Sequence, residues 1–129
     1  MTHRFPIRVY YEDTDFAGIV YYANYLKFIE RGRTEFVRSV GIDQKALRAE
    51  AGIVFAVRHV EADYLKAAYF DDELEVVTSV LELGGARIVM RQEVTRGGEV
   101  IFAATVTLVA MHENGKAARL PADIRSNLQ

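Results

Sequence analysis

The sequence predicts an α+β domain in which an antiparallel sheet packs around one long helix. Two patterns support this prediction. Apolar residues recur at helical spacing through one long segment of the first half, and they alternate at strand spacing in several segments of the second half. Glycine-containing turns separate those later segments. The order strand, long helix, short helix and then several strands is typical of an α+β domain, with the helix on one face of the sheet.

The length and composition fit a single domain. The chain has 129 residues, and 50% of them are hydrophobic, which is enough to build a core. No linker, repeat or low-complexity tract divides it, so residues 1–129 are expected to form one unit. A domain of this size leaves much apolar surface exposed, and several predicted strands are apolar on both sides. We therefore expect a second subunit against the face that does not cover the helix.

The first half predicts a strand and two helices. Side chains alternate between apolar and other types over residues 5–11, which indicates a strand. The segment 22–40 then changes to helical spacing, and Gly41 is suited to the position just after a helix. Asp43 is suited to cap a second, shorter helix that Gly52 would end. The apolar stripe of the long helix comprises Tyr22, Tyr25, Leu26, Ile29, Phe36, Val37 and Val40.

The second half predicts strands connected by tight turns. Each strand shows apolar alternation or a continuous apolar run, and each turn contains glycine. The expected strands lie at 53–65, 74–80, 88–94 and 100–111, with a short last strand near Leu120. The expected turns are Gly84-Gly85, Gly97-Gly98 and the hairpin signal Asn114-Gly115.

Charge and cysteine content exclude several classes of function. The net charge of -2 and the pI of about 5.9 give no electrostatic basis for binding nucleic acid or anionic lipid. The absence of cysteine excludes disulfides, thiolate metal sites and cysteine nucleophiles. The first residues do not resemble a signal peptide, and no apolar run has transmembrane length. We expect a cytoplasmic protein without stable membrane insertion.

Three acidic residues, Glu12, Asp13 and Asp15, lie close together in the stretch YYEDTDFAGIVYYANY. Aspartates between two elements commonly make Asx-turns or cap a helix, and composition alone favours that role. The spacing of a calcium-binding loop is absent, so no metal site is expected. A catalytic role for one of the acids is the alternative.

The catalytic alternative depends on the helix that follows these acids. Gly18 lets the backbone bend closely before a helix that is predicted to begin near Tyr22. The unpaired N–H groups and partial positive charge of a helix N-terminus can stabilise an oxyanion. An aspartate a few residues upstream could then act as a nucleophile, or as a general base for water. Hydrolysis of an activated acyl group would suit this arrangement.

Other polar and aromatic residues allow two interpretations each. Tyr22 and Tyr25 belong to the apolar helical stripe, so packing is favoured, although Tyr21 and Tyr22 also flank the helix start. Arg33 falls in the middle of the same stripe and therefore needs a partner. Glu30 is the local candidate for that partner and Asp13 the distant one, and a structural ion pair is favoured over catalysis.

Two further side chains, His59 and Arg87, could reach a substrate. His59 follows Phe55 and Val57 in a predicted strand and could face a pocket, although an ordinary strand position is the more common case. Arg87 follows the Gly84-Gly85 turn and is the best candidate to meet a phosphate, although a solvated strand face is favoured. The chain has no nucleophile-elbow context for a serine.

The stretch YYEDTDFAGIVYYANYLKFIERGRTEF resembles the hot-dog-fold acyl-CoA thioesterases. It is most similar to the 4-hydroxybenzoyl-CoA thioesterase group and its Tol–Pal-associated (YbgC-type) branch. The segments DYLKAAYFDDELEV, LELGGARIVMRQEV and RLPADIR extend the resemblance over nearly the whole chain. The family pattern Asp-x-Asp-x-x-Gly-x-Val, aromatics, Glu-x-x-Arg is matched by Asp13, Asp15, Gly18, Val20, Tyr21, Tyr22, Glu30 and Arg33.

This resemblance implies a hot-dog fold, acyl-CoA as substrate and no cofactor. It implies that Asp15 is the catalytic carboxylate and that the backbone N–H of Tyr22 binds the thioester carbonyl. It also implies a dimer or a dimer of dimers, with active sites between subunits. The residues expected to bind substrate are Gly18, Val20, Tyr21, Tyr25, Val57, His59 and Arg87.

The chain departs from each branch of this family at one place. Many members of the Tol–Pal-associated branch have histidine where this chain has Tyr22, whereas the hydroxybenzoyl branch has tyrosine. The hydroxybenzoyl branch also has basic residues near the positions of Gly84, Gly85 and Ala86, and the small residues here argue against hydroxybenzoyl-CoA as the substrate.

Two other functions stay open at this point. A hot-dog dehydratase acting on hydroxyacyl thioesters would need a histidine near the carboxylate, and no histidine lies near the helix start in sequence. A non-catalytic module that binds acyl-CoA or a protein would not need the Asp15 and Gly18 motif.

Overall fold

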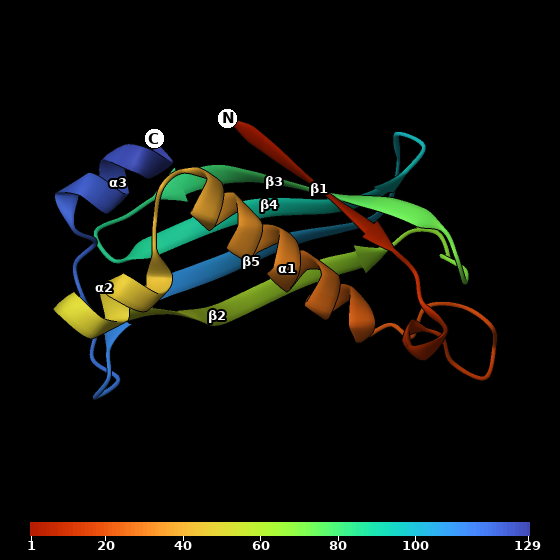
Figure 1. Cartoon of the computed structure of the whole chain (residues 1–129), viewed down its shortest axis with the longest axis horizontal. Helices are drawn as coiled ribbons and strands as arrows, with labels where there is room; N and C mark the ends of the chain where they lie inside the picture. Colours follow the sequence, from red (N-terminus) through yellow and green to blue (C-terminus); the bar gives the residue numbers. More distant parts are fainter.

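A five-stranded antiparallel sheet curves around one long helix, α1 (Figure 1). The computed structural model describes all residues from Met1 to Gln129. The predicted α+β fold is confirmed, and the strands lie in the order β1-β3-β4-β5-β2. The strands are β1 (Thr2–Arg8), β2 (Ile53–Tyr64), β3 (Glu73–Leu83), β4 (Arg87–Arg96) and β5 (Glu99–His112). The helices are α1 (Asn24–Ser39), α2 (Gln44–Ala51) and α3 (Ala122–Leu128), and a 3-10 turn, η1, spans Tyr11–Asp13.

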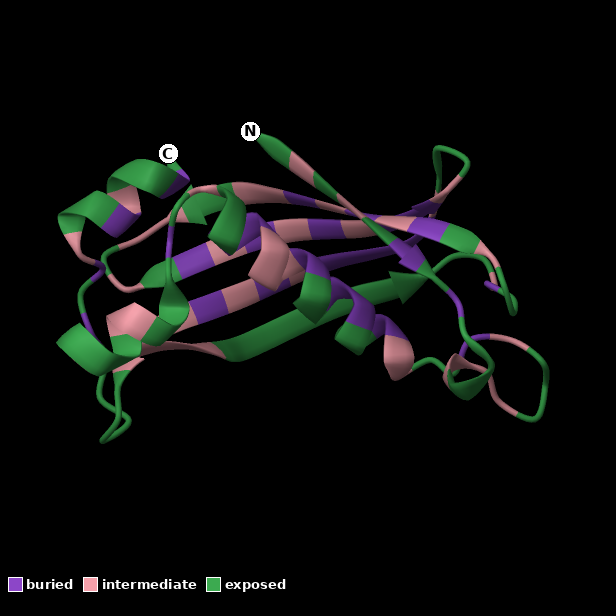
Figure 2. Cartoon of the chain, viewed as in Figure 1, coloured by how far each residue is buried: buried purple, intermediate pink, exposed green.

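The core lies between α1 and the concave face of the sheet. Buried residues follow the helix face that meets the strands, as Figure 2 shows. Helix and sheet approach closely at Gly32, where a Cβ would lie only 2.3 Å from Cγ1 of Val76 on β3. None of the three α-helices is both long and apolar enough to cross a bilayer. The largest buried side chains are Phe28, Phe36, Phe102, Ile29, Ile88, Met90 and Ile101.

The structure confirms the predicted signals at both ends of α2 and at the end of α1, where Gly41 follows the helix with φ at 86°. The carboxylate of Asp43 accepts a hydrogen bond from the Ala46 N–H at 3.0 Å and caps α2. Gly52 ends α2 in the left-handed conformation, with φ at 66°. The predicted turns at Gly84-Gly85 and Gly97-Gly98 connect β3 to β4 and β4 to β5.

The long helix begins two residues later than predicted. Tyr22 and Ala23 form a turn, because the Asn24 N–H donates to the Tyr21 carbonyl at 2.8 Å and the Asn24 side chain donates to the Asp13 carbonyl at 2.9 Å. The expectation that Tyr22 belongs to the core is therefore wrong, and its side chain is 61% exposed. Tyr25, by contrast, is buried as predicted.

The predicted strand near Leu120 is also wrong. The Asn114-Gly115 turn forms, but the returning chain makes only an isolated bridge between Met111 and Ala117. The Leu120 N–H donates instead to the Gly85 carbonyl at 2.9 Å. Pro121 follows and has no N–H to extend a ladder, and the short helix α3, which the sequence did not predict, begins after it.

Replacing Gly32 with alanine should lower the free energy of unfolding by about 1–3 kcal/mol, because the new methyl group would force α1 and β3 apart. Urea denaturation followed by circular dichroism measures this change. Gly85→Ala is the matched control, since a Cβ there meets nothing nearer than Nη1 of Arg119 at 3.7 Å. Equal stability of the two variants would contradict a tight contact at Gly32.

Candidate active site

Asp13 organises the loop that joins β1 to α1. Its carboxylate accepts a hydrogen bond from the Tyr10 N–H at 2.8 Å, which closes the turn η1. Its carbonyl accepts from the Tyr21 N–H and from the Asn24 side chain, each at 2.9 Å. Asp13 therefore ties the start of the loop to the start of the helix, in agreement with its predicted structural role.

Asp15 lies at the next turn of this loop, with one carboxylate oxygen unbonded. Its Oδ1 accepts from the Ala17 N–H at 2.9 Å, and the Gly18 N–H donates to its carbonyl at 3.0 Å. Gly18 holds a φ of 83°, which other residues adopt only with strain. The side chain is half-buried and forms no ion pair. The loop thus orients a carboxylate whose Oδ2 has no partner in the chain.

The backbone of Tyr22 presents a free N–H at the start of α1. The neighbouring amides are bonded: Tyr21 donates to Asp13, and Asn24 donates to Tyr21. The Tyr22 N–H has no such partner, while its carbonyl accepts from the hydroxyl of Tyr64 at 2.9 Å. The predicted oxyanion donor is therefore unpaired, although it lies in the turn before the helix rather than in the helix itself.

A pocket of about 330 Å³ brings Asp15 and Tyr22 together. Asp15 is its one carboxylate, and Lys66, which is paired with Glu99 at 2.7 Å, is its one cation. Most of the lining is apolar or aromatic. The residues that line it are Asp15, Ile19, Val20, Tyr21, Tyr22, Tyr25, Tyr64, Leu65, Lys66 and Ala67.

Tyr64 and the segment after it were missed by the sequence analysis. Tyr64 lies at the end of β2 and contacts the aromatic cluster behind the pocket, with ring centroids 5.5 Å from Tyr25 and 5.0 Å from Phe102. Tyr25 in turn stacks on Phe102 at 4.9 Å. Burial raises the pKa of Tyr25 and of Tyr64, which favours their neutral forms. The only signal in the sequence was the resemblance of the segment DYLKA to the family. Its contact with the loop between β1 and α1 depends on tertiary structure, which the local sequence pattern does not reveal.

Four of the predicted substrate-binding residues do not line this pocket within one chain. Val57 and His59 lie on β2, where Val57 is 47% exposed and His59 lies 3.5 Å from Glu61. Arg87 pairs with Glu82 beside the β3–β4 turn, at the opposite end of the sheet from the loop (Figure 1). Gly18 shapes the loop without lining the pocket. Contacts of these residues with a substrate stay predictions.

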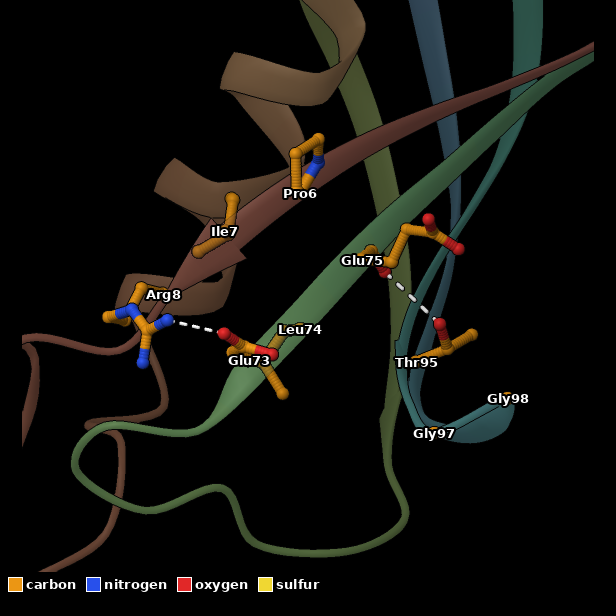
Figure 3. Close-up of a pocket in the computed structure, with 9 residues that line it drawn as sticks. All are labelled: Pro6, Ile7, Arg8, Glu73, Leu74, Glu75, Thr95, Gly97 and Gly98. Carbon is orange, nitrogen blue, oxygen red and sulfur yellow. Dashed lines mark hydrogen bonds and ion pairs between the residues drawn. The ribbon is translucent and has the colours of Figure 1, made fainter.

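A second cavity, of about 540 Å³, lies beside β1, β3 and the β4–β5 turn (Figure 3). Arg8 and Glu73 face one another there and form an exposed ion pair. Neither Asp15 nor Tyr22 contributes to this cavity. No group of three or more histidine, aspartate or glutamate side chains in the chain could hold a metal ion. The pocket at Asp15 is therefore the candidate active site.

Comparison with known proteins identifies the family. The sequence profile of the thioesterase-like superfamily matches residues 9–128. The chain belongs to this superfamily. It is 44% identical over 107 residues to the acyl-CoA thioesterase YbgC of Haemophilus influenzae, covering 83% of this chain and 79% of that protein. It is 40% identical over 106 residues to the acyl-CoA thioester hydrolase YbgC of Escherichia coli O6:H1, covering 82% and 78%.

Solved structures of thioesterases share the fold. A probable thioesterase from Bartonella henselae superposes with a TM-score of 0.90 at 40% identity, covering 94% of this chain and all of the other. A mutant 4-hydroxybenzoyl-CoA thioesterase, solved with 4-hydroxybenzoyl-CoA, superposes with a TM-score of 0.94 over 99% of both chains. At 23% identity the second likeness shows the fold alone. The expected hot-dog fold is confirmed.

In this thioesterase-like chain, Arg33 binds Gln92 rather than the predicted Glu30 or Asp13. Nη1 of Arg33 donates to Oε1 of Gln92 at 2.8 Å, whereas Glu30 accepts from Thr34. Burial lowers the pKa of Arg33, and the nearby charge of Glu30 opposes that effect. A neutral amide on β4, not a carboxylate, is therefore the hydrogen-bond partner of this guanidinium.

Gln92 connects α1 to the sheet behind the site. Its side chain is fully buried, and its Nε2 donates to the Ile29 carbonyl at 2.8 Å and to Oγ1 of Thr78 at 3.0 Å. Together with the bond from Arg33, these contacts satisfy the amide on both sides. The network fixes the middle of the helix against β3 and β4.

Replacing Gln92 with methionine keeps the volume of the side chain but should lower the free energy of unfolding by about 1–3 kcal/mol, because Arg33 and Thr78 lose a buried partner. Chemical denaturation measures the difference. Gln44→Met is the matched control, since Gln44 is exposed and its side chain makes no hydrogen bond. A loss no larger than that of the control would argue against a supporting role for the network.

Proposed function

We propose that this chain is an acyl-CoA thioesterase that hydrolyses the thioester to a free acid and CoA. The observation that carries the proposal is one pocket lined by both Asp15, whose Oδ2 is unbonded, and Tyr22, whose N–H is free. Relatives at 44% and 40% identity, named as acyl-CoA thioesterase and acyl-CoA thioester hydrolase, support the same activity.

Asp15 and Tyr22 would divide the chemistry between them. Asp15 either attacks the thioester carbonyl itself or takes a proton from a water that attacks it. The carbonyl oxygen becomes negative during attack, and the N–H of Tyr22 would stabilise it. The oxyanion then collapses, the C–S bond breaks and CoA leaves as its thiol after protonation. If Asp15 attacked directly, water would hydrolyse the resulting anhydride.

The rest of the pocket suits an acyl group. Tyr21, Tyr25 and Val20 give it aromatic and apolar walls that would shield the reacting carbonyl from water once an acyl group is bound. Gly18, Val57, His59 and Arg87 would contribute to substrate binding outside these walls. No metal or redox cofactor is needed for this reaction, because the aspartate and the backbone amide supply the groups it requires.

A dehydratase is a weaker alternative. Such an enzyme would need a histidine beside the carboxylate to move the α proton of a hydroxyacyl thioester. None of His3, His59 and His112 lines the pocket within one chain. A non-catalytic binding module is also disfavoured, because it would not need a carboxylate with a free oxygen in the same pocket as a residue whose N–H is unpaired.

The proposed assembly is a homodimer, or a dimer of dimers, that pairs through β2. This strand is 12 residues long and lies at the edge of the sheet, so its outer backbone groups have no partner strand. Most of its length is exposed on both faces (Figure 2). Exposed apolar edge strands favour pairing with another chain. A second copy would cover Val57 and Val60, and it would place the pocket, which includes the end of β2, near the subunit boundary.

Replacing Asp15 with asparagine should reduce turnover by at least about 100-fold, because the amide can neither attack nor accept the proton. The measurement is thiol release from acetyl-, octanoyl- and benzoyl-CoA by the wild-type protein and the variant, with circular dichroism to confirm folding. Glu12→Gln removes an exposed charge from the same stretch and should keep full activity. Wild-type turnover by Asp15→Asn would overturn the mechanism.

The same assays separate the alternatives. Formation of an enoyl product from a hydroxyacyl-CoA without thiol release would favour the dehydratase. Tight binding of acyl-CoA without any product would favour the binding module. Thiol release that depends on Asp15 supports the thioesterase.

Replacing Val60 with aspartate should weaken the proposed dimer, because pairing around a twofold axis brings like charges close together and buries them. Sedimentation velocity should then show more monomer at equal concentration. Leu81→Asp is the matched control, since Leu81 is 58% exposed on β3, away from the β2 edge. An unchanged oligomer in Val60→Asp, or a monomeric wild-type protein, would contradict pairing through β2.

A further inference from the structure

We propose that Tyr64 is a positioning residue for the reaction, because its hydroxyl holds the peptide that follows the N–H of Tyr22. The inference rests on the proposed thioesterase function and names a residue that this function does not by itself require. Tyr64 is not a catalytic residue in this proposal: its hydroxyl is engaged with the protein backbone, and it acts through Tyr22.

The first step is the position of Tyr22 between two fixed segments. Before it, the Val20 N–H donates to the Ala68 carbonyl at 2.9 Å, and the Tyr21 N–H donates to Asp13. After it, the helix begins at Asn24. The residue itself belongs to no strand or helix, and its side chain is 61% exposed. Regular secondary structure therefore does not fix the conformation of Tyr22.

The second step is the pair of peptide planes that flank Tyr22. The carbonyl of Tyr21 accepts from the Asn24 N–H at 2.8 Å, which fixes the plane that carries the Tyr22 N–H. In a trans peptide the N–H and the C=O point in opposite directions. Because the Tyr21 carbonyl points toward the Asn24 N–H, the Tyr22 N–H of the same peptide points away from Asn24. The next plane carries the Tyr22 carbonyl, and the Tyr64 hydroxyl is its one hydrogen-bond partner, at 2.9 Å. Without that bond, one of the two planes around Tyr22 is unrestrained.

The third step is the rigidity of Tyr64 itself. It is the last residue of β2 and pairs with Phe102 on the neighbouring strand β5. The next two amides, of Leu65 and Lys66, both donate to the Ile101 carbonyl, at 2.9 and 3.1 Å. Its ring packs edge-on against the buried ring of Phe102. The hydroxyl of Tyr64 thus fixes the carbonyl of Tyr22, 42 positions earlier in the chain, relative to the sheet.

The consequence concerns the transition state more than binding. Donors that stabilise an oxyanion work because they are held in place before the charge develops. A small misplacement of such a donor can reduce the rate by up to about 100-fold. Loss of the Tyr64 hydroxyl leaves the acyl pocket its aromatic walls, so the ground-state complex should form normally. The effect should therefore appear in kcat rather than in KM.

The test is Tyr64→Phe, which removes the hydroxyl and keeps the ring against Tyr25 and Phe102. On the best substrate among acetyl-, octanoyl- and benzoyl-CoA, kcat should fall by about tenfold or more with KM changed by less than about threefold. Tyr11→Phe is the matched control, since the Tyr11 side chain is 84% exposed and its hydroxyl makes no hydrogen bond. This control should keep the wild-type kcat.

A second measurement separates positioning from general loosening. In an Asp15→Asn background, which blocks turnover, calorimetric binding of the same acyl-CoA should be equal with and without the Tyr64→Phe substitution. Amide hydrogen exchange should rise in Tyr64→Phe at Asn24, whose N–H donates to the Tyr21 carbonyl across this turn, with the rest of α1 unchanged. Exchange that rises throughout the helix, or a KM that rises as much as kcat falls, would overturn the positioning role.

The outcomes distinguish this inference from the function on which it rests. If the wild-type protein releases no thiol from any of the acyl-CoA substrates, the proposed function fails and the inference fails with it. If the wild-type protein is active and Tyr64→Phe keeps its kcat, the inference alone is overturned. A lower kcat with unchanged KM, binding and overall stability supports it.

Discussion

The close contact between α1 and the sheet is the constraint on which the rest of the structure depends. Gly32 leaves no room for a side chain above Val76, so the helix lies directly against β3. The buried amide of Gln92 adds hydrogen bonds to the Ile29 carbonyl and to Arg33 beside this contact. Packing sets the distance between helix and sheet, and the amide sets the register along it. These contacts fix the helix to which the loop carrying Asp13 and Asp15 is joined.

The site follows from that placement and from a division of work between two aspartates. Asp13 uses both its carboxylate and its carbonyl to close the loop onto the helix start. Asp15 uses one oxygen for the Ala17 N–H and keeps the other free at the pocket. Asp13 and Asp15, two aspartates two positions apart, therefore differ in what their oxygen atoms contact. Those contacts, more than the presence of a carboxylate, distinguish the structural Asp13 from Asp15, the acid proposed to react.

The sequence predicts the fold well where the signals are local. The Asp43 cap, Gly52 and the glycine turns each depend on neighbours in the chain, and the structure contains all of them. Most of the helical stripe is also buried as predicted, although Leu26 is 42% exposed. The errors concern segments that long-range contacts decide. Helical spacing assigned Tyr22 to the core, but Asn24 bonds across the loop to Asp13 and starts the helix after it. Leu120 lies where a strand was expected, but its N–H bonds to Gly85.

The candidate site divides in the same way. Asp15, Val20, Tyr21, Tyr22 and Tyr25 lie within one short stretch, so sequence reasoning could find them together. Arg33 was recognised as a charge that needs a partner. Its partner, the amide of Gln92 on β4, is far away in sequence and uncharged, so charge pairing could not predict it. Tyr64 could not be connected to Tyr22 either, because their contact exists only after β2 has paired with β5.

The position of Tyr64 also connects the pocket to the exposed edge of the sheet. One side of β2 pairs with β5, and its other side has no partner strand in the chain. The same strand ends at the residue that holds the Tyr22 carbonyl. A second copy that paired along this edge would therefore restrain the strand end and, through the Tyr64 hydroxyl, the turn before α1. In the proposed dimer, assembly and the order of the proposed oxyanion donor would rest on the same twelve-residue strand.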